Sequence, residues 1–184
     1  MGPTCVPTVQ SKRGCCCFLQ PRGMIGIGVI ICDQKGSIVA AMSKCLPLPL
    51  GPLEVEVKAI DEAALFAWEV GIRDIILKTD SCTAWHALQD PSAASVSISN
   101  IIFGICLRLH DFHSFDSLHV RRQTNKPAHT LAAYAKNIDS FVTWIEDCPS
   151  FIESLVIQDA LLFPLVKLKL RISNFFKKKN PYIY

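Results

Sequence analysis

Two carboxylates in this 184-residue chain, Glu56 and Asp80, occupy positions that predict a functional site. Asp80 follows the β-branched run IRDIILK (72–78), which is typical of a buried strand, and Glu56 stands at the opening of the helix before that strand. A carboxylate at the carboxyl end of a central strand lies at the rim where open α/β sheets place their ligands and functional groups. The two residues therefore predict a site at one rim of a sheet.

The elements that must position these carboxylates can be predicted from the spacing of apolar residues. Residues 55–70 carry apolar side chains at intervals of three and four, which predicts a helix that ends at Gly71. Residues 72–78 follow as a strand, and a second helix is expected after Thr79-Asp80-Ser81, reaching about Leu88. This helix, strand and helix form the unit around which the remaining elements are arranged.

The flanking segments complete an alternation of strands and helices. MIGIGVIICD and QKGSIVAAMS predict a hairpin through residues 33–36. Gly26 and Gly28 leave one face of its first strand as bare backbone that another element or a ligand can approach. A helix is expected over residues 96–112, a strand over 115–122 and a helix from Pro127. FVTWIEDCPSFIESLVIQDALLF (141–163) is expected to be an amphipathic segment. This order predicts a mixed sheet with helices on its faces.

Composition limits the class of protein. Half of the residues are apolar, 19% are charged and the net charge is +3, which indicates one globular domain. The nine cysteines are odd in number and include no CxxC pair, which argues against a secreted disulfide framework and a zinc module and favours an intracellular protein with reduced thiols. No apolar run reaches the roughly 18 residues of a membrane span.

The two ends of the chain differ from its centre. Residues 1–22 show neither helical nor strand periodicity and are predicted to be a disordered leader, with Cys15 to Cys17 of unassigned role. Residues 161–184 form a basic tail, in which six Lys and Arg side chains lie between 167 and 179. A basic run of this kind is usually a solvated tail. The more specific alternatives are a nuclear targeting signal and a phosphate-binding segment.

Four runs carry a resemblance to a known family. GIGVIICDQKGSIVAAMS, EVEVKAIDEAALFA, RDIILKTDSCTAWHAL and HVRRQTNKPAHTLAAYA occur in the order and spacing of type 1 ribonuclease H, and they resemble the domains of plants and of retrotransposon reverse transcriptases in particular. The resemblance implies an α/β ribonuclease H-like fold, a mixed five-stranded sheet flanked by helices, over residues 23–160. We expect this domain to be a monomer.

The same resemblance implies an activity and a set of site residues. The family cleaves the RNA strand of RNA–DNA hybrids with two Mg²⁺ ions held by four acidic residues, and such ions stabilise both the attacking and the leaving oxygen. Glu56 and Asp80 match two of those metal ligands, and the fourth position falls on His129. Arg121 and Arg122, beside the Asn125 turn, are expected to contact phosphates of an RNA–DNA hybrid or of RNA.

The sequence departs from the family at the first strand, which should carry an aspartate. No acidic residue precedes Asp33, so we expect this strand to be missing or replaced, with CCCFL (15–19) as its stand-in. Two carboxylates and an imidazole are a weak set for two divalent ions. Two hypotheses follow: a Mg²⁺-dependent nuclease, or a catalytically degenerate member that binds only nucleic acid or a protein partner.

Structural explanations of the same residues need no ligand. Glu56 could interact with the helix macrodipole and Asp80 could cap the helix that follows it, each worth about 1 kcal/mol at best. Arg121 and Arg122 could form a solvated strand end. The remaining histidines, His119 among them, have no ligand-like spacing and are expected to be ordinary surface or strand residues.

Overall fold

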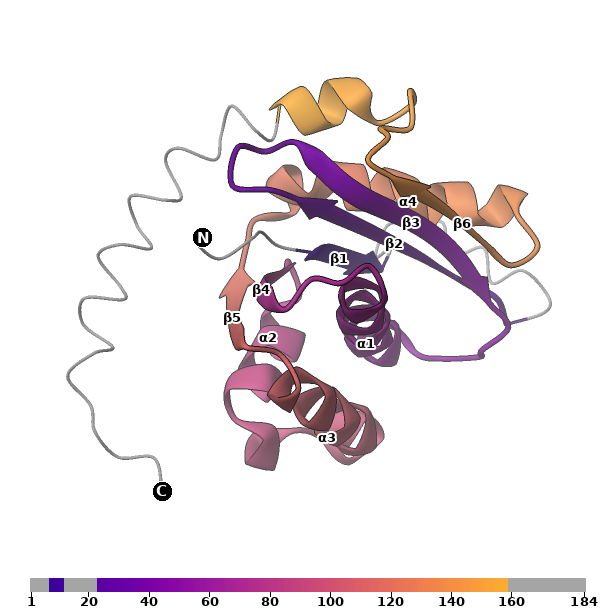
Figure 1. The fold of residues 1–184 in the computed structure, drawn as a ribbon. Helices are drawn as coiled ribbons and strands as arrows, with labels where there is room; N and C mark the ends of the chain where they lie inside the picture. The colour runs from indigo at the N-terminus through magenta and orange to yellow at the C-terminus, as the bar shows by residue number, and fades with distance from the viewer. Residues whose placement is uncertain (1–6, 12–22, 159–184) are drawn as a thin grey trace.

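The computed structural model describes residues 7–11 and 23–158, which form a six-stranded sheet in the order β5-β4-β1-β2-β3-β6 (Figure 1). The strands are β1 (Pro7–Ser11), β2 (Ile25–Cys32), β3 (Ile38–Leu46), β4 (Asp74–Thr79), β5 (Ser114–His119) and β6 (Phe141–Ile145). Parallel pairing joins β1 to β4 and β4 to β5, whereas β1-β2, β2-β3 and β3-β6 are antiparallel. The sheet is therefore mixed, as predicted.

The first strand is present, and the expectation that it is missing or replaced by residues 15–19 is wrong. β1 is formed by PTVQS at residues 7–11, inside the range predicted to be a disordered leader. It lies between β2 and β4 and pairs with both. The segment was missed because five residues that include a proline give too short a pattern to predict a strand, and two neighbouring strands provide the pairing. Cys15 to Cys17 lie outside the described residues.

The helices cover both faces of the sheet (Figure 1). On one face, α1 (Pro52–Glu69), α2 (Cys82–Gln89) and α3 (Val96–His110) enclose the larger core with side chains such as Ile60, Ile75 and Ile102. On the other face, α4 (Lys126–Tyr134) and a helical segment at 153–158 pack over a smaller cluster that includes Ile30 and Leu131. The short 3-10 turns are η1 (Pro91–Ala93), η2 (Arg122–Asn125) and η3 (Ala135–Asn137).

Gly26 and Gly28 allow α4 to lie directly on β2, which confirms the predicted close approach. A Cβ atom at Gly28 would overlap the carbonyl oxygen of Ala128, and one at Gly26 would overlap that of Ala132. The backbone of α4 therefore occupies the space that side chains of β2 would otherwise fill. This contact fixes the start of α4, and with it His129, relative to the sheet.

Residues 141–163 were expected to be amphipathic, and their first part forms a strand that the sequence did not predict. Residues 141–145 form β6, which pairs with β3 and adds a sixth strand to the five that were predicted. The run FVTWI has the aromatic and β-branched composition of a strand, and the edge of β3 supplies its partner. Of the helices in the described residues, none is long and apolar enough to cross a membrane.

Candidate functional site

Asp80 lies at the carboxyl end of β4, where the chain turns into α2. β4 ends at Thr79 and α2 begins at Cys82, so Asp80 stands in the connection at the rim of the sheet. Ser81, not Asp80, caps the helix, because the Ser81 hydroxyl accepts the hydrogen bond from the Ala84 amide at 3.3 Å. The hypothesis that Asp80 caps the helix is therefore wrong. The Asp80 side chain is largely buried, with an exposed fraction of 10%.

His129 lies against Asp80. Pro127 stands in the first turn of α4 and places His129 on the side of the helix that faces the rim. His129 Nε2 is 3.7 Å from Asp80 Oδ2, which is within ion-pair range but too long for a hydrogen bond. Among the described residues, neither ring nitrogen of His129 has a hydrogen-bond partner, although both are buried. The structure thus brings together two residues that are far apart in the sequence.

Glu56 is the second carboxylate and lies near the start of α1. The helix begins at Pro52, so Glu56 is in its second turn, and its side chain is buried at 8% exposure. An interaction with the helix macrodipole alone would be typical of an exposed carboxylate in the first turn. Glu56 is neither exposed nor in the first turn. Within the described ranges, no three His, Cys, Asp or Glu side chains are close enough together to hold a metal ion.

β1 identifies the residue that stands beside Asp80 in the sheet. Thr8 pairs with Lys78 in the parallel ladder, so Gln10 is level with Asp80 two residues further along each strand. Gln10 also pairs with Gly28 of β2, the glycine that faces α4. The sequence prediction missed Gln10, since it placed the first strand elsewhere. The central strand therefore contributes an amide residue at this level of the sheet.

The carboxyl end of β5 contributes a basic border to the rim. Arg121 precedes η2 and Arg122 begins it, and both are exposed, whereas Asn125 at the end of η2 is fully buried. His119 is level with Thr79 in the parallel ladder, and its Nε2 lies 3.3 Å from the carbonyl oxygen of Asp80. His119 was predicted to be an ordinary strand residue. Because β4 and β5 are neighbouring parallel strands, their carboxyl ends meet at one rim. That adjacency was the signal from which the position of His119 could have been predicted.

An aromatic side chain supports this border from α2. The Trp85 Nε1–H donates to the carbonyl oxygen of Ser117 at 3.1 Å, which ties α2 to β5. The Trp85 and His119 rings lie 6.3 Å apart. The border beside Asp80 is therefore held by side-chain contacts between two elements.

The donor set does not fit the two-magnesium site that the family resemblance implies. Magnesium takes oxygen ligands in near-octahedral geometry, and a pair of ions requires several carboxylates. Asp80 and His129 converge but are not joined by a third donor in the described part of the chain, and β1 contains no acidic residue. Imidazole is also a poorer ligand than a carboxylate for this ion.

The comparisons agree with this architecture. A model of the family described as reverse transcriptase-like matches residues 13–135. The chain belongs to the reverse transcriptase-like family. This match covers all four runs on which the resemblance was based, and the predicted ribonuclease H-like domain is confirmed. No match was found among curated proteins.

Solved structures share the fold of this reverse transcriptase-like domain. RNase H1 from the halophilic archaeon Halobacterium salinarum is 21% identical at a TM-score of 0.63, over 72% of this chain and 96% of that protein. LC11-RNase H1, in complex with an RNA/DNA hybrid, is 17% identical at a TM-score of 0.60, over the same shares of the two chains. At these identities, the likeness establishes the ribonuclease H fold.

Proposed function

We propose that this domain binds RNA–DNA hybrids at the rim formed by β4, β5 and α4, and that it does not cleave them. The observation that carries the proposal is the position of Gln10, an amide residue level with Asp80 where the family resemblance implies a carboxylate. A neutral amide adds no charge that would attract Mg²⁺. The ribonuclease H fold is present and the described first strand supplies no carboxylate, which supports binding over hydrolysis.

The basic border provides the contacts to nucleic acid. Arg121 and Arg122 are exposed at the end of β5, within the same rim as Asp80 and His129. Guanidinium groups bind phosphates, and such contacts position a nucleic acid without reading its sequence. Asn125 is fully buried at the end of η2, so its side chain is not placed to contact the phosphates. The hybrid bound to LC11-RNase H1, which shares the fold, supports this class of ligand.

Binding of a fluorescent RNA–DNA hybrid, with EDTA or with Mg²⁺, tests the proposal. We expect the same affinity in both conditions and an affinity that falls as salt rises, because counterions are released from phosphates. Arg122→Ala should weaken binding by about threefold to tenfold at low salt. Lys136→Ala, which also removes one exposed cation but at the far end of α4, is the matched control and should leave affinity unchanged.

Asp80→Asn gives a second test through the sign of its effect. In the absence of a bound metal ion, Asp80 repels phosphates, so its neutralisation should raise hybrid affinity by about twofold to fivefold. If Mg²⁺ bridged Asp80 and the phosphates, the same substitution would lower the affinity in Mg²⁺ and not in EDTA. Binding that requires Mg²⁺ would contradict the proposal.

The second candidate function is the Mg²⁺-dependent cleavage of RNA in RNA–DNA hybrids. The convergence of Asp80 and His129, 3.7 Å apart, favours it because both are positions that the family resemblance assigns to the metal site. Incubation of a labelled hybrid with the protein and Mg²⁺ distinguishes the two functions. Cleavage above that of the Glu56→Gln/Asp80→Asn double variant would establish the nuclease, and equal product from both proteins would reject it.

A further inference from the structure

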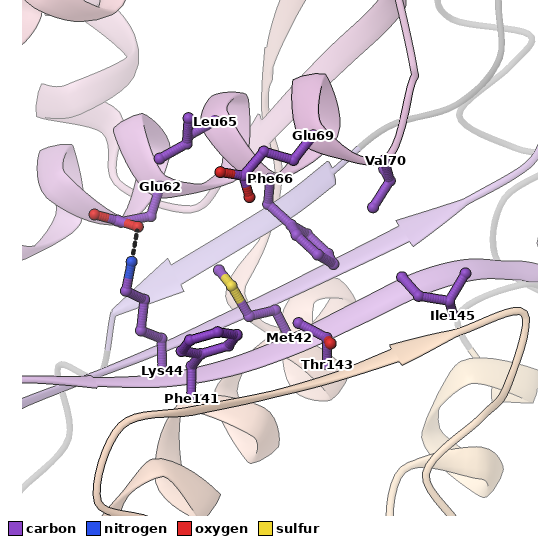
Figure 2. Close-up of a pocket in the computed structure, with 10 residues that line it drawn as sticks. All are labelled: Met42, Lys44, Glu62, Leu65, Phe66, Glu69, Val70, Phe141, Thr143 and Ile145. Atoms are coloured by element: carbon purple, nitrogen blue, oxygen red, sulfur yellow. Dashed lines mark hydrogen bonds and ion pairs between the residues drawn. The ribbon is translucent and has the colours of Figure 1, made fainter.

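A groove lies between α1 and β6, on the face of the sheet that α1 covers (Figure 2). It has a volume of about 370 Å³, and its floor is formed by Met42 and Phe66. Phe141 and Ile145 of β6 border it on one side and Leu65 of α1 on the other. Phe141 is 58% exposed and Ile145 is 54% exposed. Large apolar side chains are thus exposed along one face of β6.

The other face of β6 is covered. Trp144 packs against Tyr134 and Phe151, with ring centroids 6.0 Å from each. Side chains alternate between the two faces of a strand, so Val142 and Trp144 face this cluster while Phe141, Thr143 and Ile145 face the groove. β6 therefore has the composition of a strand that is covered on both faces, but only one face is covered by the described residues.

β6 also has an open edge. It is the last strand of the described sheet, and its partner is β3. The Cys45 amide donates to the Ser140 carbonyl at 2.7 Å and the Glu146 amide donates to the Val39 carbonyl at 2.8 Å. In this register the amides of Val142 and Trp144 point toward β3, and those of residues 141, 143 and 145 point away from it. An edge of this kind is a template for another strand.

Residues 166–172, which lie outside the described part, have the sequence expected of that strand. VKLKLRI alternates four apolar residues with Lys167, Lys169 and Arg171, which is the period of an amphipathic strand. The seven residues 159–165 join this segment to the helical segment at 153–158, and they can span up to about 25 Å. The helical segment itself packs beside Trp144 through Ile152 and Val156.

The charges of the two segments are complementary. Between residues 137 and 158 there is no Lys or Arg, and the four acidic residues are Asp139, Glu146, Asp147 and Glu153. Three of them flank β6 directly in the sequence. Residues 160–184 contain no acidic residue and include six Lys and Arg. Attraction between these segments favours pairing within one chain over pairing of two acidic β6 edges from separate chains.

We propose that residues 166–172 add to the open edge of β6 as a seventh strand. Its four apolar side chains cover Phe141 and Ile145 beside the groove, and its three cations lie on the opposite face near the carboxylates that flank β6. Main-chain hydrogen bonds supply the pairing and the alternate side chains supply the specificity, as in other cases of strand addition. This surface lies on α1 and β6 and does not depend on the proposed hybrid binding.

Residue-resolved amide exchange by NMR of the full chain tests this pairing. We expect the amides of residues 141, 143 and 145 to be protected, although they point away from β3. In the Leu168→Pro/Leu170→Pro variant they should exchange at least about tenfold faster, because proline cannot donate to a ladder. The amides of Val142 and Trp144 should change little, and Phe175→Pro/Phe176→Pro, outside the segment, is the matched control.

Three results would overturn the proposal. The amides that point away from β3 could exchange freely in the natural chain, which would show an unpaired edge. Their protection could be unaffected by Leu168→Pro/Leu170→Pro, which would show another covering element. Their protection could increase with protein concentration, which would show that two copies pair through β6.

Discussion

Two groups of buried carboxylates, one at the rim and one on the middle of α1, have different surroundings. Glu62 Oε2 lies 2.7 Å from Lys44 Nζ and its Oε1 lies 3.0 Å from Lys58 Nζ. Asp61 Oδ2 lies 2.7 Å from Lys58 Nζ. At the rim, His129 Nε2 lies 3.7 Å from Asp80 Oδ2, and an imidazole is charged only when it is protonated.

The two groups differ in how their charges are satisfied. Burial lowers the pKa of the Lys58 ammonium, but its hydrogen bonds to Asp61 and Glu62 outweigh that effect and hold the pKa above its ordinary value. The α1 cluster therefore satisfies its charges internally and stabilises the fold. At the rim, both ring nitrogens of His129 are buried without a hydrogen-bond partner in the described structure, and a group of this kind costs stability, which proteins accept at sites of binding.

The strongest test concerns the contact that holds α4, and therefore His129, at the rim. Gly28→Ala places a Cβ against the Ala128 carbonyl oxygen, and we expect a loss of about 3 kcal/mol or more of unfolding free energy. Gly104→Ala in α3 is the control, because its Cβ meets no atom within 4 Å and should stabilise the helix by about 0.5–1 kcal/mol. Chemical denaturation measures both, and equal effects would show that α4 does not depend on this contact.

The α1 cluster should be the more sensitive of the two carboxylate groups to neutralisation. Glu62→Gln leaves two partly buried ammonium groups without their shared carboxylate, and we expect a loss of about 2 kcal/mol. Glu69→Gln, which changes an exposed carboxylate in the last turn of the same helix, should change stability by less than about 0.5 kcal/mol. Urea unfolding monitored by circular dichroism compares them. Equal values would show that the ion pairs of Glu62 do not stabilise the fold.

The rim can be made more like a metal site by one substitution. Gln10→Glu adds a carboxylate at the level of Asp80, and we expect it to tighten Mg²⁺ binding by about tenfold, since affinity follows the number of charged ligands. Isothermal titration of the protein with MgCl₂ measures the change. Thr8→Glu, on the same strand but level with Lys78, is the control. An unchanged affinity for Gln10→Glu would show that this position is not part of the rim.

The smallest effect is expected at His129. Its ring nitrogens are buried without a hydrogen-bond partner in the described structure, so His129→Leu should raise the unfolding free energy by about 1 kcal/mol. Thermal unfolding of the variant and the natural protein checks this. His110→Leu, on the exposed surface of α3, should leave the melting temperature unchanged. Destabilisation by His129→Leu would indicate that the imidazole contributes to the fold.

The sequence by itself determined the family, the order of the elements between residues 23 and 134 and the bare face of β2 that another element can approach. Those features rest on local patterns: helical periodicity in α1, β-branched residues in β4 and the alternating glycines of β2. Only the tertiary structure identified β1 and β6. Each is a five-residue strand whose pairing comes from residues distant in the sequence, so its own pattern is too short to decide.

The same division applies to the site. Asp80 was predicted to be a site residue from its place at the end of a strand, and His129 was predicted to be one from the family resemblance. Only the fold brought them to 3.7 Å and placed Gln10 level with Asp80. It also placed Asn125 in the interior and His119 at the rim. The register and burial of a strand depend on which strands lie beside it. The local sequence of the strand does not specify those neighbours.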